Sequence, residues 1–203
     1  MKRLVFPVFV GLAMVAASLP GAVLQQADDA PDFTLTDTYS QQHTLSDYEG
    51  QWVVLEWLNY DCPIVREHSD SGNMQDLQEE YTNDGVVWLS IVSSAPGQQG
   101  YFSNDEMNAR TTEHSGHQTA VLMDPDGIVG RAYDARTTPQ MVVITPTGEI
   151  VYNGAIDDRP SPDPATLNGA TNYLVNALGA AMNGNAVSPA TTQPYGCSVK
   201  YGS

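Results

Sequence analysis

The stretch that decides the fold covers residues 52–63 and reads WVVLEWLNYDCP. Its first seven residues, 52–58, are apolar on both faces except for Glu56, which is typical of a buried strand in a parallel sheet. Pro63 suits the first position of a helix, because the backbone amide that proline lacks would have no helical partner there. The stretch therefore predicts a buried strand over 52–58 and a helix that begins at Pro63, with Cys62 between them.

Cys62 is the candidate nucleophile. At the N-cap of the predicted helix, its sulfur would lie beside free backbone N–H groups and the positive end of the helix dipole. Both favour the thiolate and lower the pKa of a cysteine, and we expect the sulfur to be within reach of an incoming partner. Arg66 would add a positive charge, whereas Asp61 and Glu67 would oppose it, so the sequence leaves the net shift open. The alternative is a small buried cysteine with no chemical role.

Glu56 is a carboxylate in a strand that otherwise has no polar position. Burial of a lone charge is unfavourable, so such a group is paired, protonated or functional. From its position upstream of Cys62, it could accept the proton of that thiol. The alternative is a strand end that opens to water.

The rest of the chain alternates between strand and helix patterns. We expect further strands over residues 32–37, 86–92, 120–123, 141–144 and 149–152, of which the last two form a hairpin. We expect a helical turn over 45–48, helices over 63–83, 104–114 and 167–182, and a simple turn over 124–127. This order indicates an α/β fold in which a central mixed sheet is covered by helices on both faces.

Length and composition limit the function. The chain has 203 residues, 24 acidic against 8 basic side chains, and two cysteines. The excess of acid argues against a nucleic-acid partner, which would need clustered lysine and arginine. Two cysteines cannot build a disulfide-rich scaffold or a four-thiolate zinc site. Without a glycine-rich phosphate loop, neither a nucleotide nor a flavin is indicated, and we expect no cofactor and no metal.

The two ends of the chain differ from its middle. Residues 1–22 have a basic start, a short apolar run and a small-residue exit. These features predict a cleaved secretory signal and a periplasmic or extracellular location, the alternative being retention as a membrane anchor. Residues 28–185 form one expected domain. Residues 186–203 begin with the composition of a flexible linker and form a tail that carries Cys197.

Four segments carry a resemblance to known families. Residues 56–67, with Cys62 followed by proline, resemble the active-site segment of the thioredoxin superfamily. Ala30-Pro31-Asp32-Phe33-Thr34-Leu35, followed by Leu45-Ser46-Asp47-Tyr48, is similar to the start of redoxin (AhpC/TSA, peroxiredoxin-like) domains. Thr137-Thr138-Pro139 is similar to the cis-proline loop of the superfamily.

The resemblance implies both a fold and a site. It implies a thioredoxin-like fold and a thiol-dependent oxidoreductase with Cys62 as its single active-site cysteine. Glu56 falls in the position of the superfamily's buried carboxylate, and Pro139 falls in the loop that lies against the active cysteine. We therefore take Cys62, Glu56, Pro139 and Arg66 as candidate site residues, with Cys197 as the fifth.

Two departures from the family patterns bear on the reaction. Val65 stands where a Cys-x-x-Cys motif has its second cysteine, so an ordinary thioredoxin dithiol is excluded. Leu55 and Asn59 stand where peroxiredoxins have a proline and a threonine, and Gln140 stands where they have an arginine. Peroxidase activity is thus implied by the family but lacks part of its usual residue set.

Cys197 gives the reaction a second thiol. Two-cysteine peroxiredoxins place their resolving cysteine in a C-terminal tail, so the resemblance implies that a peroxide or a protein disulfide oxidises Cys62 and that Cys197 then bonds to it. An unidentified thiol reductant would reopen that bond. The alternative is a non-catalytic binding protein in which Cys62–Cys197 is a structural disulfide. A third interpretation is a metal carrier that uses Cys62 and His68, and an oligomer is not indicated.

Overall fold

The computed structural model describes residues 28–202, so the predicted secretory signal over residues 1–22 lies outside it. The strands are β1 (Asp28–Asp29), β2 (Thr34–Asp37), β3 (Gln42–Thr44), β4 (Val53–Trp57), β5 (Val87–Val92), β6 (Ala120–Met123), β7 (Thr137–Thr138), β8 (Met141–Ile144), β9 (Glu149–Gly154) and β10 (Cys197–Ser198). The helices are α1 (Pro63–Asp70), α2 (Asn73–Asn83), α3 (Asn104–Glu113), α4 (Ile128–Ala132) and α5 (Tyr173–Met182), with short 3₁₀ helices η1 (Leu45–Tyr48) and η2 (Pro164–Leu167). Within the described range, none of these helices has both the length and the apolar character needed to cross a bilayer.

Eight strands form one mixed sheet in the order β1-β9-β8-β4-β5-β6-β2-β3. The five residues of β4 are all buried, and the strand lies parallel to β5 and antiparallel to β8. Because β4 is paired on both edges and covered on both faces, its residues have to be apolar unless they find partners inside the core. The predicted α/β class with a central mixed sheet is confirmed.

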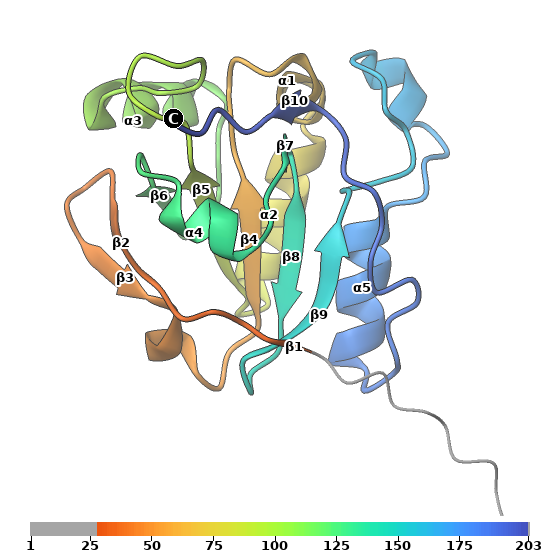
Figure 1. Cartoon of the computed structure of the whole chain (residues 1–203). Coiled ribbons are helices and arrows are strands. Elements are labelled where there is room, and N and C mark those ends of the chain that lie inside the picture. Colours follow the sequence, from red (N-terminus) through yellow and green to blue (C-terminus); the bar gives the residue numbers. More distant parts are fainter. Residues whose placement is uncertain (1–27, 203) are drawn as a thin grey trace, which may run out of the picture.

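Helices cover both faces of this sheet (Figure 1). On one face, α4 and η1 pack over a buried cluster that includes Leu55 and Trp57. On the other face, α2 and α5 pack over a cluster that includes Val54 and Trp88. Neighbouring residues of β4 reach opposite clusters because side chains alternate along a strand. A third, smaller cluster lies beyond the end of β4 and contains Cys62.

Several predicted helix boundaries are wrong. The helix predicted over 63–83 is divided into α1 and α2, because Gly72 has a φ of +80°, which belongs to the left-handed region. The helix predicted over 167–182 reaches back only to Tyr173, where the side chain of Asn172 caps α5. The five-residue helix α4 follows the turn predicted over 124–127 and was not expected, since it is too short to give a periodic pattern.

The expectation of a flexible C-terminal tail is also wrong for the described residues. Residues 190–202, here called the strap, cross one end of the sheet from the α5 side to the α3 side (Figure 1, dark blue). Within the strap, β10 pairs antiparallel with β7. Backbone hydrogen bonds also join Asn153 to Ala190, Arg136 to Val199 and Ala95 to Lys200. The strap is therefore docked on the domain along most of its length.

Two glycines mark the closest approach between the strap and the domain. A Cβ at Gly154 would collide with Thr192 of the strap. A Cβ at Gly196, on the strap itself, would collide with the carbonyl oxygen of Thr138, and Gly196 has a φ of +125° that disfavours other residues. The fit between the two surfaces thus depends on residues that lack a side chain.

Candidate functional site

Cys62 lies where it was predicted, at the N-cap of α1, with proline at the first helical position. Its backbone is extended, with φ −80° and ψ 124°. Its N–H donates to the carbonyl of Asn59 at 2.9 Å, and its carbonyl accepts from the N–H of Arg66 at 2.9 Å. These bonds fix the sulfur at the positive end of α1, beside the backbone N–H groups of Ile64 and Val65.

The sulfur of Cys62 is not open to solvent, although we expected it to be within reach of a partner. The residue is 0% exposed, and both Cys197 of the strap and Thr138 contact its sulfur. The N–H of Cys197 donates to the Cys62 sulfur at 3.2 Å, and the Cys62 thiol donates to the carbonyl of Thr138 at 3.2 Å. Cys197 and Thr138 are paired in the β10–β7 ladder, so one small ladder makes both contacts. A partner therefore reaches this sulfur only when the strap moves.

The two cysteines are free thiols with opposite acidity. Burial raises the pKa of Cys62, but hydrogen bonds from Cys197 and from the backbone of Val65 and Ile64 outweigh burial, and its pKa lies below the ordinary value. Burial raises the pKa of Cys197, as do the hydrogen bond and the charge of Cys62, while Lys200 lowers it in part. Cys62 is thus the more acidic thiol of the pair.

Glu56 is buried in the core, with 1% of its surface exposed. One oxygen, Oε2, accepts hydrogen bonds from Trp88 at 2.8 Å, Ser90 at 2.9 Å and Gln78 at 3.1 Å. The other, Oε1, has no partner within the described part of the chain. Burial raises the pKa of Glu56, and the three donors offset this only in part. Its hydrogen bonds go to these three side chains, and Cys62 is not among them.

Arg66 and His68 lie on α1, but the side-chain contacts that the structure gives them are with other residues than Cys62. The guanidinium of Arg66 is exposed and lies 3.7 Å from the carboxylate of Asp70, so the predicted support for the thiolate is directed elsewhere. His68 is buried, with its Nε2 3.9 Å from the carboxylate of Asp157. Among residues 28–202, no group of three or more potential metal ligands comes together.

Pro139 follows β7 directly, and its peptide bond with Thr138 is cis, as the resemblance implied. Because the carbonyl of Thr138 contacts the Cys62 sulfur, this loop lies against Cys62. Gln140 stands where peroxiredoxins have an arginine, and its Nε2 donates to Asn153 at 2.9 Å. Gln140 is therefore occupied with the domain's own polar groups.

Sequence reasoning named Thr138 only as part of the cis-proline loop, and it missed Tyr195 and Asp157 as candidate site residues. The hydroxyl of Tyr195 donates to the carboxylate of Asp157, which is buried. Tyr195 precedes Cys197 by two residues, so this bond holds the strap next to the second thiol. The run Tyr-Gly-Cys inside a linker composition was the available signal for Tyr195. Asp157 gave no signal, because it lies in a polar loop among other aspartates.

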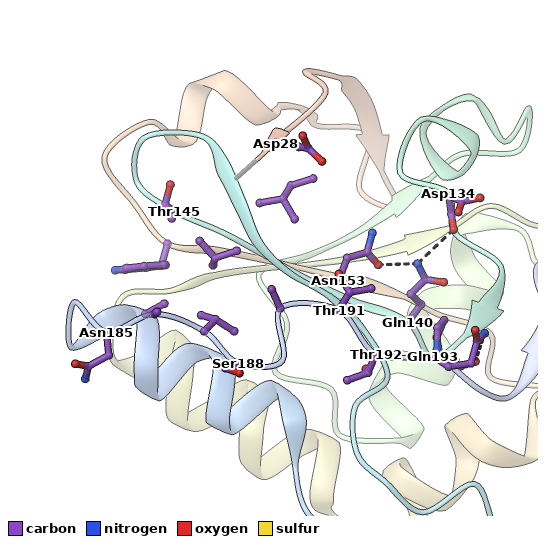
Figure 2. A pocket seen from close by; sticks show the side chains of 18 of the residues that line it. Asp28, Asp134, Gln140, Thr145, Asn153, Asn185, Ser188, Thr191, Thr192 and Gln193 are labelled. Carbon is purple, nitrogen blue, oxygen red and sulfur yellow. Dashed lines mark hydrogen bonds between the residues drawn. The ribbon is translucent and has the colours of Figure 1, made fainter. Parts of the chain in front are cut away.

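A cavity of about 820 Å³ lies between β9, the C-terminal end of α5 and residues 185–194 (Figure 2). Figure 2 shows the side chain of Gln140 within this cavity, bonded to Asn153 and Asp134. The cysteines do not line it. The cavity therefore flanks the strap, and we assign the candidate site to the Cys62–Cys197 junction.

Comparison with known proteins bears on the family and the fold. The model of the AhpC/TSA family matches residues 27–153, which include Cys62 and Pro139 but not Cys197. The thiol-disulfide oxidoreductase ResA of Geobacillus kaustophilus is 30% identical over 122 residues, which cover 60% of this chain and 64% of ResA. The matched region thus spans just under two thirds of the length of such curated relatives.

Two solved structures show how far the fold is shared. An uncharacterised conserved protein from Geobacillus kaustophilus has a TM-score of 0.75 at 26% identity, over 87% of this chain and 92% of that protein. The exposed lipoprotein thioredoxin of Streptococcus pneumoniae has a TM-score of 0.51 at 24% identity, over 68% of this chain and 97% of that one. The expected thioredoxin-like fold is confirmed.

Proposed function

Because the chain belongs to the AhpC/TSA family, we propose that it is an exported thiol-dependent oxidoreductase in which Cys62 and Cys197 form a reversible disulfide. The observation that carries the proposal is the hydrogen bond from the N–H of Cys197 to the sulfur of Cys62. It brings two cysteines that are far apart in the sequence to the N-terminus of one helix. Export is supported by the signal-like pattern of residues 1–22.

In the first step, the Cys62 thiolate attacks one sulfur of a substrate disulfide. A bond forms between the Cys62 sulfur and that atom, and the substrate S–S bond breaks. The other substrate sulfur leaves as a thiolate and takes a proton from solvent. Because the Cys62 sulfur is buried, the strap has to move aside before the attack.

In the second step, Cys197 attacks the sulfur of Cys62. The Cys62–Cys197 bond forms, the mixed disulfide breaks, and the second substrate sulfur leaves with the proton that Cys197 gives up. In the mixed disulfide Cys62 carries no charge, so it no longer raises the pKa of Cys197 through its charge. Lys200 still lowers the pKa of Cys197 at this step. One substrate disulfide becomes two thiols, and a separate thiol reductant restores the two cysteines.

Glu56 and Pro139 support these steps without bonding to the substrate sulfur. Glu56 is a buried group that can hold a proton close to the end of β4, and we assign it the role of proton relay for Cys62. Pro139 shapes the loop whose carbonyl group, that of Thr138, faces the Cys62 sulfur. The role of Glu56 rests on the resemblance, and that of Pro139 rests on the resemblance and on the contact between the Thr138 carbonyl and the Cys62 sulfur.

A peroxide is the second candidate substrate, favoured by the lowered pKa of Cys62. The thiolate would attack a peroxide oxygen and become a sulfenic acid, with release of an alcohol or water, and Cys197 would displace water from it to form the same disulfide. We favour a disulfide substrate, because Asn59 and Gln140 replace the threonine and arginine of peroxiredoxins. In the folded chain both are engaged in contacts of their own.

Mass spectrometry of the reduced protein after one equivalent of oxidant tests the proposal. We expect oxidised glutathione to give loss of two hydrogens and a peptide that joins Cys62 to Cys197. Hydrogen peroxide should give the same product more slowly than it does with a peroxiredoxin. If neither oxidant joins the two cysteines within minutes, the proposed reaction is wrong. A bond that forms but resists mild thiol reductants would support the non-catalytic binding protein instead.

A further inference from the structure

The strap is fastened by a buried polar contact outside the two-thiol site. The carboxylate of Asp157 is 2% exposed and accepts hydrogen bonds from the hydroxyl of Tyr195 and, at 2.8 Å, from the backbone N–H of Arg159. Its other oxygen lies 3.9 Å from the Nε2 atom of His68. This Nε2 atom has no hydrogen-bond partner among the described residues. The proposed reaction uses none of these groups.

The bond between Tyr195 and Asp157 is of a strong type. Burial and the bond to Asp157 raise the pKa of Tyr195 far above its ordinary range, so the phenol stays a donor. A neutral donor bound to a buried carboxylate forms a charge-assisted hydrogen bond, which is about twice as strong as one between neutral groups. The strap's other tyrosine anchor, from Tyr201 to the carbonyl of Ala135 at 2.7 Å, is a neutral pair. Tyr195 is therefore the stronger of the two.

The position of this anchor fixes the second thiol. Cys197 follows Tyr195 by two residues, which span roughly 7 Å in extended chain. Between them, Gly196 passes so close to the carbonyl of Thr138 that a side chain would not fit. On the far side, β10 pairs with β7. The chain between Tyr195 and Cys197 thus has little freedom while the anchor holds.

We propose that Tyr195 and Asp157 form a latch that positions Cys197 against Cys62. The latch keeps the second thiol at the sulfur that it has to attack, and so raises the effective concentration of Cys197 in the second step. Opening of the latch frees the strap and uncovers Cys62 for the first step. Both are positioning residues, and their effect on the second step rests on the proposed function.

The test compares Tyr195→Phe with a matched control, Tyr39→Phe, in the full chain. Both variants lose one hydroxyl, but Tyr39 is 71% exposed. In the reduced protein, we expect hydrogen exchange at the Cys197 amide to be roughly ten- to a hundredfold faster in Tyr195→Phe than in the wild type or the control. The equilibrium constant for the Cys62–Cys197 disulfide against glutathione should fall by a similar factor, which corresponds to a potential about 30–60 mV higher.

A second variant keeps the test decisive. Gly196→Ala leaves the Tyr195 hydroxyl in place but forces the strap away from Thr138, so it should also speed exchange at Cys197. If only Gly196→Ala has this effect, strand pairing alone holds the strap and the latch is refuted. The latch is equally refuted if Tyr195→Phe matches Tyr39→Phe in both exchange and potential. If the wild type forms no disulfide, the proposed function fails, while exchange at Cys197 still decides the latch.

Discussion

Cys62 and Cys197 are the same side chain in two opposite settings. Cys62 is the N-cap of an eight-residue helix and faces its free N–H groups, whereas Cys197 lies on a two-residue strand. The first setting lowers the pKa of a thiol, and the second, next to the charge of Cys62, raises it. The comparison teaches that the order of the two proposed steps is set by what surrounds each sulfur, since the pKa of Cys62 is lowered and that of Cys197 is raised.

The most severe test of this asymmetry replaces each cysteine by serine. Cys62→Ser should lose reduction of a disulfide by roughly a thousandfold or more, because the thiol with the lowered pKa is gone. Cys197→Ser should still react once with a chromogenic aromatic disulfide and then stop as a mixed disulfide at Cys62. Stopped-flow absorbance and intact mass separate the two outcomes. Equal reactivity of both single-cysteine variants would break the comparison.

The variant Glu56→Gln tests the surroundings of Cys62. The glutamine keeps an acceptor for Trp88, Ser90 and Gln78 but cannot exchange a proton. We expect the attack by Cys62 to slow by roughly ten- to a hundredfold, towards the lower end of what general acid–base catalysis contributes. The rate at which Cys197 resolves a preformed mixed disulfide should change much less. If the rate of attack by Cys62 is unchanged in Glu56→Gln, Glu56 has no role in the mechanism.

The variant Glu67→Gln tests the comparison on the side of the strap, which carries Cys197. Burial raises the pKa of Glu67 to about 7, with Thr166 opposing and the charges of Asp157 and Asp163 adding to the effect. The folded protein thus keeps a proton that the unfolded chain releases near pH 4.5. This contribution to stability is fully present below about pH 4.5 and is lost as the pH rises through about 7.

Urea unfolding between pH 4 and pH 8 measures the effect of Glu67→Gln. The wild type should lose on the order of 1–3 kcal/mol across this range through this one group, and the variant should lose that much less. Glu67 lies beside Asp157, so its ionisation should also loosen the strap near Cys197 before it affects Cys62. Parallel pH profiles for the wild type and Glu67→Gln would contradict this.

Arg66→Ala should have the smallest effect. Arg66 forms an exposed ion pair with Asp70 on the same helix, and such pairs contribute about 0.3–0.5 kcal/mol. We expect the pH at which Cys62 becomes reactive to stay the same, because the backbone N–H groups and Cys197 dominate its acidity. Iodoacetamide labelling rates across pH provide the measurement. A marked rise in that pH would show that the charge of Arg66 supports the Cys62 thiolate, as the sequence predicted.

The sequence was sufficient where neighbouring residues determine the structure. The buried strand around Glu56 was predictable because its apolar run has no polar face, and the N-cap at Cys62 was predictable because proline follows it. The break at Gly72 was not, because residues 66–73 contain no large apolar residue, so the apolar pattern there marks neither the end of one helix nor the start of the next.

The strap was misjudged for a different reason. Its composition is that of a linker, and its contacts are backbone bonds and tyrosine hydroxyls that reach residues far away in the sequence, such as Asn153, Ala135 and Asp157. Local propensity carries no information about such partners. For the same reason, the burial of Cys62 under Cys197 was not foreseen, although both cysteines were proposed as site residues.

The contact between Cys62 and Cys197, which the β10–β7 ladder holds in place, has a consequence for the unfolded chain. A bond between Cys62 and Cys197 would close a loop over a sequence separation of 135 residues, most of the described chain. Such a cross-link restricts the unfolded ensemble and, on a chain-entropy account, stabilises the native state by about 5 kcal/mol. Reduction of the disulfide would therefore lower the melting temperature of the protein. The melting temperature would then report whether the two cysteines are oxidised or reduced.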